Sequence, residues 1–339
     1  MLKQSPHTNS FNEFKTGLFD PQTGEYVLED PRTPTPWMHY LFNREYTALV
    51  SVTGGGYSFH KSAKDRRLLR ARPNNVPFDR PGRYIYIRDN ETGDFHSAGW
   101  APVMKDLSLQ KYRCRLGAGY MSIESEYTEI ESILTYFVPI DDNCEIWRLK
   151  LRNKGSSPRN LSLVSYAEFA IYNAEADRDN YQYTYNIASC RGQDNFIIHD
   201  TQAFFNKVIT LFGCSQKVHS YDCDREVFIG PYNTEANPGG LLAGSLSNRD
   251  ISGGNPCAAQ QVNIGLAPKE EKEVIFFMGV DETPQKAKES FVKYFNSNVT
   301  EKSLSTVKDH WKDIMNRFIF RTPSEECNHF NNFWGPCQM

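Results

Sequence analysis

The hydrophobic pattern of the chain changes near residue 280. From about residue 46 to 280, short apolar or alternating runs are separated by clusters of Gly, Pro, Asn and Asp, which is typical of a large antiparallel β protein. The clearest strand lies in "EIWRLKLRN" (145–153), where Trp147 and Leu149 share one face and basic residues occupy the other. Similar runs predict strands over 83–89, 133–139, 207–212 and 272–279.

After residue 280 the apolar residues recur at helical spacing. Thr283 followed by Pro284 is a favourable helix start, because a threonine hydroxyl caps free N–H groups and proline loses nothing at the first helical position. The apolar face of this first helix comprises Ala287, Phe291, Tyr294 and Phe295. A second helix is expected from about Glu301, with an apolar face of Leu304, Val307, Trp311, Ile314, Met315 and Phe318. A third helical pattern follows Pro323.

Charge and composition exclude several classes of protein. Lys and Arg total 38 and Asp and Glu total 41, a net charge of -3, so the chain has no electrostatic signature for nucleic acid or an anionic membrane. No apolar stretch approaches the length of a membrane span and no signal-peptide pattern is present, so we expect a cytoplasmic protein. The eight cysteines form no CxxC pair and are predicted to be reduced and mostly buried.

Three consecutive glycines, at positions 54 to 56, follow a β-branched run and precede the strand-like triplet Tyr-Ser-Phe. The segment lacks the Gly-Lys-Ser/Thr ending of a phosphate-binding P-loop, and no helix follows it. We therefore expect a backbone turn, or a close approach of the chain to another surface. At least one of these glycines should have a positive φ or lie against another backbone segment.

Residues with catalytic chemistry are sparse. The eight histidines show no HxH, HxxxH or HExxH spacing, so no catalytic metal is expected. Glu124, Glu126, Glu129 and Glu131 offer the carboxylate pair that a glycosidase needs, but acids at this alternating spacing are more typical of the solvent-facing side of a strand. The segment "EADRDN" (175–180) lacks the EF-hand pattern and is interpreted as a solvated turn.

Longer segments carry a more specific signal. They are "GLFDPQTGEYVLEDPRTPTPWMHYLFN" (17–43), "TGGGYSF" (53–59), "RRLLRARPNNVPFDRPGRYIYIRD" (66–89), "AGWAPV" (98–103), "YRCRLGAGY" (112–120), "FVPIDDNCEIWRLKLRN" (137–153), "FIGPYNTEANP" (228–238), "GGNPCAAQ" (253–260) and "NNFWGPCQ" (331–338). In this order they resemble the N-terminal region of the inverting glycoside phosphorylases, which include cellobiose and N,N'-diacetylchitobiose phosphorylases. The resemblance covers nearly the whole chain, and its colinearity makes it specific.

The resemblance implies a mainly β fold. It places a large antiparallel β-sandwich, or supersandwich, at residues 1–280, a short helical linker at 281–322 and the start of an α/α barrel at 323–339. In this family the barrel carries the chemistry, in which a carboxylic acid protonates the glycosidic oxygen while inorganic phosphate attacks the anomeric carbon from the opposite face. The barrel residues that perform these steps lie beyond the equivalent of Met339. We therefore expect a non-catalytic N-terminal part, with no catalytic residue in this chain.

The resemblance also implies partners. It requires no cofactor, uses inorganic phosphate as a co-substrate, and suggests three partners: a β-linked disaccharide, the catalytic barrel domain and a second copy in a homodimer. No nucleic acid or membrane partner is expected. The surface that meets the barrel, at the rim of the active site, is expected to include Gly54, Gly55, Gly56, Tyr57, Phe59 and Arg115. Tyr57 and Phe59 would be its anchors.

Two segments depart from the family pattern. Arg115 begins Arg-Leu-Gly-Ala-Gly-Tyr, where the family usually has Arg-His-Gly-Leu-Gly-Tyr, and Gly335 and Pro336 fall inside the third helical pattern, where proline costs about 3 kcal/mol. Two other functions remain open from the residues alone. One is a stand-alone carbohydrate-binding or scaffolding β domain, and the other is an independent glycosidase that uses the Glu124 to Glu131 cluster.

Overall fold

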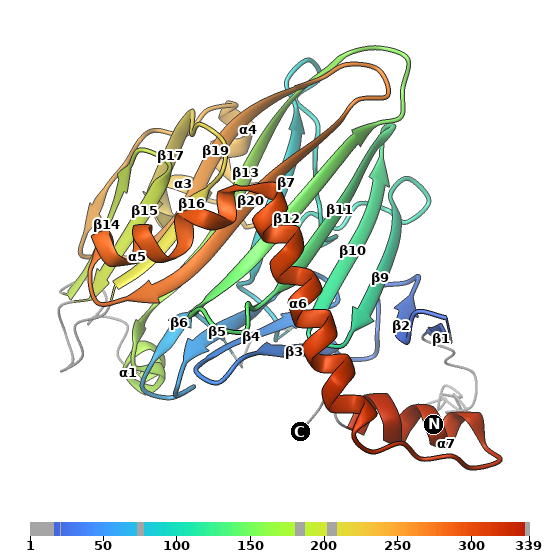
Figure 1. Cartoon of the computed structure of the whole chain (residues 1–339). Coiled ribbons are helices and arrows are strands. Elements are labelled where there is room, and N and C mark those ends of the chain that lie inside the picture. Colours follow the sequence, from blue (N-terminus) through green and yellow to red (C-terminus); the bar gives the residue numbers. More distant parts are fainter. Residues whose placement is uncertain (1–16, 21, 73–77, 180–186, 202–208, 336–339) are drawn as a thin grey trace, which may run out of the picture.

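The computed structural model describes residues 17–20, 22–72, 78–179, 187–201 and 209–335. Within them, two large antiparallel sheets pack face to face (Figure 1). The first sheet has 11 strands: β1 (Leu18–Asp20), β2 (Glu25–Leu28), β9 (Lys111–Gly117), β10 (Tyr120–Tyr127), β11 (Ile130–Phe137), β12 (Cys144–Asn153), β14 (Ala188–Gln193), β15 (Phe196–Thr201), β16 (Ile209–Cys214), β18 (Ile251–Ser252) and β20 (Glu271–Asp281). Their order is β1-β2-β9-β10-β11-β12-β20-β16-β15-β14-β18.

The second sheet has nine strands: β3 (Met38–Phe42), β4 (Tyr46–Ser51), β5 (Gly56–His60), β6 (Arg67–Leu69), β7 (Arg83–Asp89), β8 (Phe95–Ser97), β13 (Arg159–Tyr172), β17 (Ser220–Asp224) and β19 (Pro256–Leu266). Their order is β17-β19-β13-β6-β5-β4-β3, while β7 pairs with β13 and β8 pairs with β7. The long strand β13 pairs with β7 and β19 first and with β6 at its end. The β3–β6 part thereby lies across the lower end of the sandwich in Figure 1.

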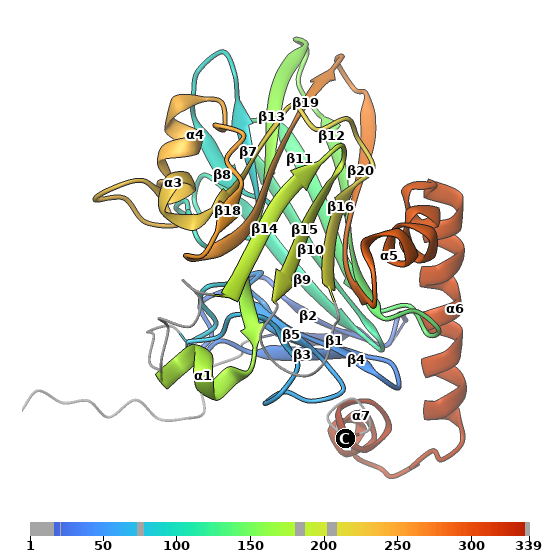
Figure 2. The same cartoon turned by 90° about the vertical axis from the view of Figure 1, so that its left-hand side faces the viewer.

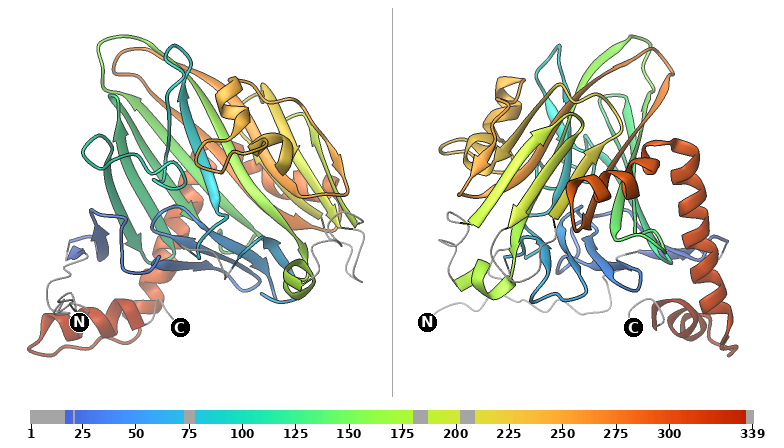
Figure 3. Two further views of the ribbon diagram at one scale, coloured as in Figure 1. Left: turned by 180° about the vertical axis from the view of Figure 1, so that it is seen from behind. Right: turned by 60° about the vertical axis from the view of Figure 1, so that its left-hand side comes forward.

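Helices lie on both outer faces of the sandwich and at its lower end in Figure 1. They are α1 (Ala174–Asp179), α3 (Arg225–Ile229), α4 (Gly239–Ala243), α5 (Pro284–Phe291), the 3₁₀-helix η1 (Val292–Phe295), α6 (Ser297–Asn316), α7 (Glu325–His329) and the π-helix η2 (Phe330–Trp334). Helices α3 and α4 lie on the second sheet, as Figure 3 shows from behind, and α5 and α6 lie on the first (Figure 2). Among the described helices, none combines the length and the apolar character that a membrane span requires.

Three apolar clusters join these layers. The central cluster lies between the two sheets and contains the fully buried Trp147 and Phe169. A second cluster, with Phe277 and Trp311, joins the first sheet to α5 and α6. A third joins the second sheet to α3 and α4 and contains Phe228. Full burial of a large apolar side chain contributes about 1.5–3 kcal/mol, so these clusters bind helices and sheets into one body.

The predicted β architecture is confirmed. The strand predicted over 83–89 is β7, the one over 133–139 overlaps β11, and the one over 272–279 lies within β20. Of the strand predicted over 207–212, the residues that the structure describes belong to β16. The predicted helix start is also confirmed, because the Thr283 hydroxyl accepts a hydrogen bond from the Lys286 N–H at 3.2 Å.

The second helix differs from its prediction at both ends. Helix α6 begins four residues before Glu301, because the side chain of Asn296 accepts hydrogen bonds from the first free N–H groups and caps the helix there. Phe318 was predicted on the apolar face, but it lies beyond the end of α6 and is 70% exposed. In the third helical pattern Gly335 is helical, and Pro336 lies outside the described residues.

Candidate functional site

The glycine turn between β4 and β5 has the backbone that its sequence predicts. Gly54 has a φ of +93° and Gly56 a φ of +110°, a region that side-chain-bearing residues rarely adopt. A Cβ at Gly55 would collide with the backbone carbonyl oxygen of Asp79. The expectation of positive φ or close backbone approach is therefore confirmed.

Asp79 holds this turn from a separate segment of the chain. Its Oδ2 accepts hydrogen bonds from the hydroxyls of Ser51 at 2.7 Å and Thr53 at 2.6 Å. Its carbonyl oxygen accepts from the Gly56 N–H at 2.8 Å. The turn is thus packed inside the domain, and the carboxylate beside it disfavours an anion such as phosphate.

Tyr57 and Phe59 lie on the outer side of β5, together with two aromatic residues of β3. Through Leu49 and Thr47 of the intervening β4, Tyr57 is in register with Tyr40 and Phe59 with Phe42, so all four side chains share one side of the sheet. We call this group the β3–β5 aromatic face: Tyr40, Phe42, Tyr57 and Phe59. Tyr40 is 40% exposed, and the Arg67 guanidinium lies 4.1 Å from the centre of the Tyr57 ring. The face is therefore a partly exposed aromatic surface.

An apolar groove opens beside the glycine turn. Its volume is ≈ 390 Å³, and it is lined by Thr53, Phe78, Trp100, Met104 and the proline-rich segment 31–36. Phe78 is 43% exposed and Met104 is 40% exposed. The sequence did not predict this groove, because the segments that line it are far apart along the chain.

Arg115 lies on β9 of the first sheet, whereas the glycine turn lies between β4 and β5 of the second. Its guanidinium pairs with Glu124 at 2.8 Å and with Glu25 at 3.1 Å. Tyr120 donates a hydrogen bond to Glu25, and Lys308 of α6 lies 4.0 Å from the centre of the Tyr120 ring. Arg115 therefore belongs to an ion-paired cluster between the first sheet and α6.

The acidic residues that follow Arg115 are also ion-paired. Glu126 accepts hydrogen bonds from Lys154 at 2.8 Å and from Lys111 at 2.9 Å, and the two lysines hold the pKa of this carboxyl below its ordinary value. A glycosidase general acid requires a shift in the opposite direction. Glu124 is bound to Arg115, as described, and Glu131 lies 3.7 Å from Lys154. The cluster fits the solvent-facing strand that its spacing predicted.

A buried ion network was missed by the sequence reasoning. The fully buried carboxylate of Glu168, on β13, pairs with Arg72 at 3.2 Å and also with Arg225, which binds Glu235 at 2.7 Å. Arg72 lies in the segment 66–89 and Glu235 in the segment 228–238, both of which carry the family resemblance. No local pattern reveals the network, because the residues that join Glu168 in it lie 57 to 96 positions away along the chain.

The same region corrects the interpretation of "EADRDN". Residues 175–179 of this segment belong to helix α1 rather than to a solvated turn, and residue 180 lies outside the described residues. The Asp177 side chain is nearly buried and forms two hydrogen bonds to Arg70, at 2.8 and 2.9 Å. Arg70 also donates to Asn255 at 3.1 Å. The ion pair with the buried Arg70 compensates Asp177 for the loss of its hydration. The charges of this region are therefore compensated within the chain.

Two stacked antiparallel sheets with helices on both outer sides define a supersandwich. The same fold occurs in a bacterial glucoamylase complexed with acarbose, with a TM-score of 0.50 and 8% identity over 86% of this chain and 41% of that one. The glycosyl hydrolase 94 supersandwich domain matches residues 24–297. The chain therefore belongs to this family.

Relatives of known activity agree with the family. N,N'-diacetylchitobiose phosphorylase of Vibrio furnissii is 31% identical over 94% of this chain and 40% of its own length. The 3-O-beta-D-glucopyranosyl-beta-D-glucuronide phosphorylase of Paenibacillus borealis is 29% identical over the same shares. The chain thus spans about 40% of the length of these relatives.

Proposed function

We propose that this chain serves as the N-terminal, non-catalytic part of a glycoside phosphorylase. Such an enzyme cleaves a β-linked disaccharide with inorganic phosphate and yields a glycosyl 1-phosphate and a free sugar, without a cofactor. The observation that carries the proposal is the match of residues 24–297 to the glycosyl hydrolase 94 supersandwich domain. The similarity to the Vibrio furnissii relative covers 94% of the chain. The proposal also includes a cytoplasmic homodimer and a domain boundary near residue 280.

The proposed partner is a catalytic barrel domain, on the same polypeptide or on another. Helix α6 descends along the first sheet and leads to α7 at the end of the molecule that carries β3 to β5 (Figures 1 and 2). At this end Phe318 is 70% exposed and Phe330 is 63% exposed, and the β3–β5 aromatic face lies nearby. Exposed aromatic residues that gather at one end are typical of a contact surface. We assign this end, with Tyr57 and Phe59 as anchors, to the catalytic domain.

The chemistry of the described residues supports a non-catalytic role. Inverting phosphorolysis needs an acid with a raised pKa on one side of the scissile bond and an anchored phosphate on the other. The exposed carboxylates of β10 and β11 are neutralised by lysine and arginine, while Arg70, Arg72 and Arg225 are each paired with a carboxylate. The exposed acids of β10 and β11 and these three arginines are therefore engaged within the chain, which supports the proposal for these groups.

The experiment is an assay of the purified chain with cellobiose or N,N'-diacetylchitobiose, with and without phosphate. We expect neither a glycosyl 1-phosphate nor free monosaccharide, because removal of the general acid alone typically forfeits about 10²- to 10⁴-fold in rate. A full-length diacetylchitobiose phosphorylase serves as the positive control. Phosphate-dependent release that survives repurification would contradict the proposal, and phosphate-independent hydrolysis would favour a glycosidase.

A further inference from the structure

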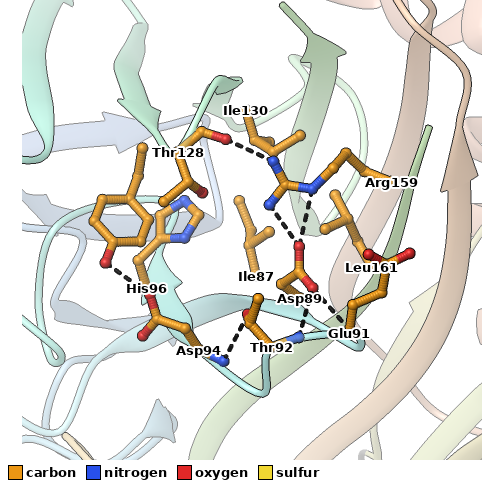
Figure 4. Close-up of a pocket in the computed structure, with 11 residues that line it drawn as sticks. Ile87, Asp89, Glu91, Thr92, Asp94, His96, Thr128, Ile130, Arg159 and Leu161 are labelled. Atoms are coloured by element: carbon orange, nitrogen blue, oxygen red, sulfur yellow. Dashed lines mark hydrogen bonds and ion pairs between the residues drawn. The ribbon is translucent and has the colours of Figure 1, made fainter. Parts of the chain in front are cut away.

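A polar pocket lies between two hairpin turns of the sandwich (Figure 4). One wall is the turn between β7 and β8, from Asp89 to Asp94, and the facing wall is the turn between β10 and β11, with Thr128. Arg159 of β13 closes one side. The pocket has a volume of ≈ 400 Å³, within the range of small-molecule sites and large enough for one sugar ring.

Apart from the exposed Glu91, the charged groups of this pocket are already compensated. Arg159 binds Asp89 Oδ2 through its Nε at 2.9 Å and donates through Nη1 to the Thr128 carbonyl oxygen at 2.7 Å (Figure 4). Asp94 pairs with Lys105 at 2.7 Å and accepts a hydrogen bond from the Tyr127 hydroxyl at 2.7 Å. No cation of the lining is left for an anionic ligand, and the polar walls exclude a purely apolar one.

His96 lines the pocket and has a buried ring nitrogen without a hydrogen-bond partner among the described residues. It is 3% exposed, and its Nε2 is buried without a hydrogen bond to any part of the chain that the structure describes. Burial lowers its pKa to about 3, so the ring is neutral and offers one donor and one acceptor. The Tyr127 ring lies 4.9 Å away, centre to centre, and provides a flat apolar surface beside it. A buried imidazole nitrogen without a partner is costly and calls for an explanation.

The facing turn is also costly. Thr128 has a φ of +48° and Glu129 a φ of +64°, at the two central positions of a two-residue hairpin where Asn-Gly is favoured. A β-branched residue at positive φ is an outlier, and such strain is often retained where a side chain serves a site. Thr128 lines the pocket and places its carbonyl against Arg159.

We propose that this pocket binds a single ring of a neutral, polyhydroxylated ligand, namely a sugar. A ligand hydroxyl, which both donates and accepts, satisfies the neutral His96 ring, and the Tyr127 ring packs against the apolar face of the sugar. Asp89 and Asp94 are paired with Arg159 and Lys105, so these two carboxylates do not select for a charged ligand. The exposed Glu91 disfavours an acidic sugar. This site is separate from the proposed role in phosphorolysis and does not rest on it.

The test is a titration of the whole chain with D-glucose, N-acetyl-D-glucosamine, methyl β-D-glucoside and D-glucuronate, followed by ligand-observed NMR. The methyl glycoside mimics a sugar at the end of a glycan, and the free sugars test for a soluble monosaccharide as the ligand. We expect saturable binding of at least one neutral probe and weaker binding of glucuronate. His96→Phe keeps an aromatic ring but removes both nitrogens, and should weaken binding about tenfold without lowering the melting temperature.

Two further variants separate binding from folding. Thr128→Gly relieves the positive φ and removes the side chain from the pocket, so it should bind the sugar more weakly while melting no lower than the parent. Lys61→Gly is the matched control, because Lys61 has a φ of +63° but does not line the pocket, and its affinity should be that of the parent. The proposal is overturned if no neutral probe binds, if His96→Phe binds like the parent, or if glucuronate binds as tightly as the neutral sugars.

Discussion

Gly55 lies against the carbonyl oxygen of Asp79, and this contact explains why the turn needs a residue without a side chain. The carbonyl cannot move away freely, because it also accepts the hydrogen bond of the Gly56 N–H. We predict that Gly55→Ala lowers the free energy of unfolding by about 1 kcal/mol or more. Gly265→Ala is the control, since nothing lies within 4 Å of a Cβ there. Equal urea midpoints for the two variants would show that the turn is not tightly packed.

Burial protects most of the cysteines. Six of the seven that the structure describes are buried, and burial raises the pKa of Cys114 and of Cys214 to about 12, so both remain thiols at neutral pH. Cys327 is exposed. We predict that titration of the denatured, non-reduced protein finds all eight thiols, and that Cys327 reacts before the buried six in the native protein. A count near zero would contradict the proposed cytoplasmic location.

The sequence predicted the backbone conformation of single residues but not the distant residues that contact them. The unusual φ of the glycine turn follows from local chemistry, because glycine alone tolerates such a backbone at no steric cost. Asp79 was not predicted as the group that holds the turn, since 28 residues separate it from Ser51. Arg115 was grouped with the turn only by resemblance, and the structure places it on the other sheet.

Helix α6 illustrates which properties of an element are readable from sequence. Its apolar face was predicted through Leu304, Val307 and Trp311, all of which are buried against the first sheet. Its start was predicted four residues too late, because Ser297 and the polar residues after it gave no apolar period, while Asn296 supplies the cap. The apolar periodicity therefore located the helix, whereas the Asn296 cap determines the residue at which it starts.

An ion pair fastens the first part of α6 to the sheet. Arg148 of β12 binds Glu301 and also Glu273 of β20, at 2.6 Å for the latter. The hydrogen bond from Arg148 lowers the pKa of Glu301 below its ordinary value of 4.5. The stabilisation is thus complete above pH 4.5 and is lost as the pH falls through the lowered pKa of the folded state.

We predict that Glu301→Gln lowers the melting temperature at neutral pH and that the difference from the parent shrinks in acid, as the parent loses its ion pair. Because Glu301 is largely exposed, the effect at neutral pH should be modest. Glu289→Gln on α5 is the control, since this carboxylate faces Gln285 and not a cation. A difference that is constant with pH, or equal in the two variants, would show that the ion pair does not fasten α6.

The molecule as a whole is a four-layer stack of helices, two sheets and helices. The alternating pattern predicted β structure but not the order of the strands, because pairings such as β12 with β20 join residues more than 100 positions apart. The Glu168 network and the apolar groove escaped prediction for the same reason. These contacts depend on the folded arrangement rather than on local sequence.

A chimera can show whether this supersandwich serves a phosphorylase. In it, the chain replaces the matching 40% of Vibrio furnissii N,N'-diacetylchitobiose phosphorylase, and the measurement is phosphate-dependent release of the glycosyl 1-phosphate. We predict release by the chimera, none by the chain alone, and reduced release when Tyr57 and Phe59 are both replaced by alanine on the proposed docking surface. A folded chimera that releases no glycosyl 1-phosphate would contradict the proposed function and favour a stand-alone sugar-binding or scaffolding role.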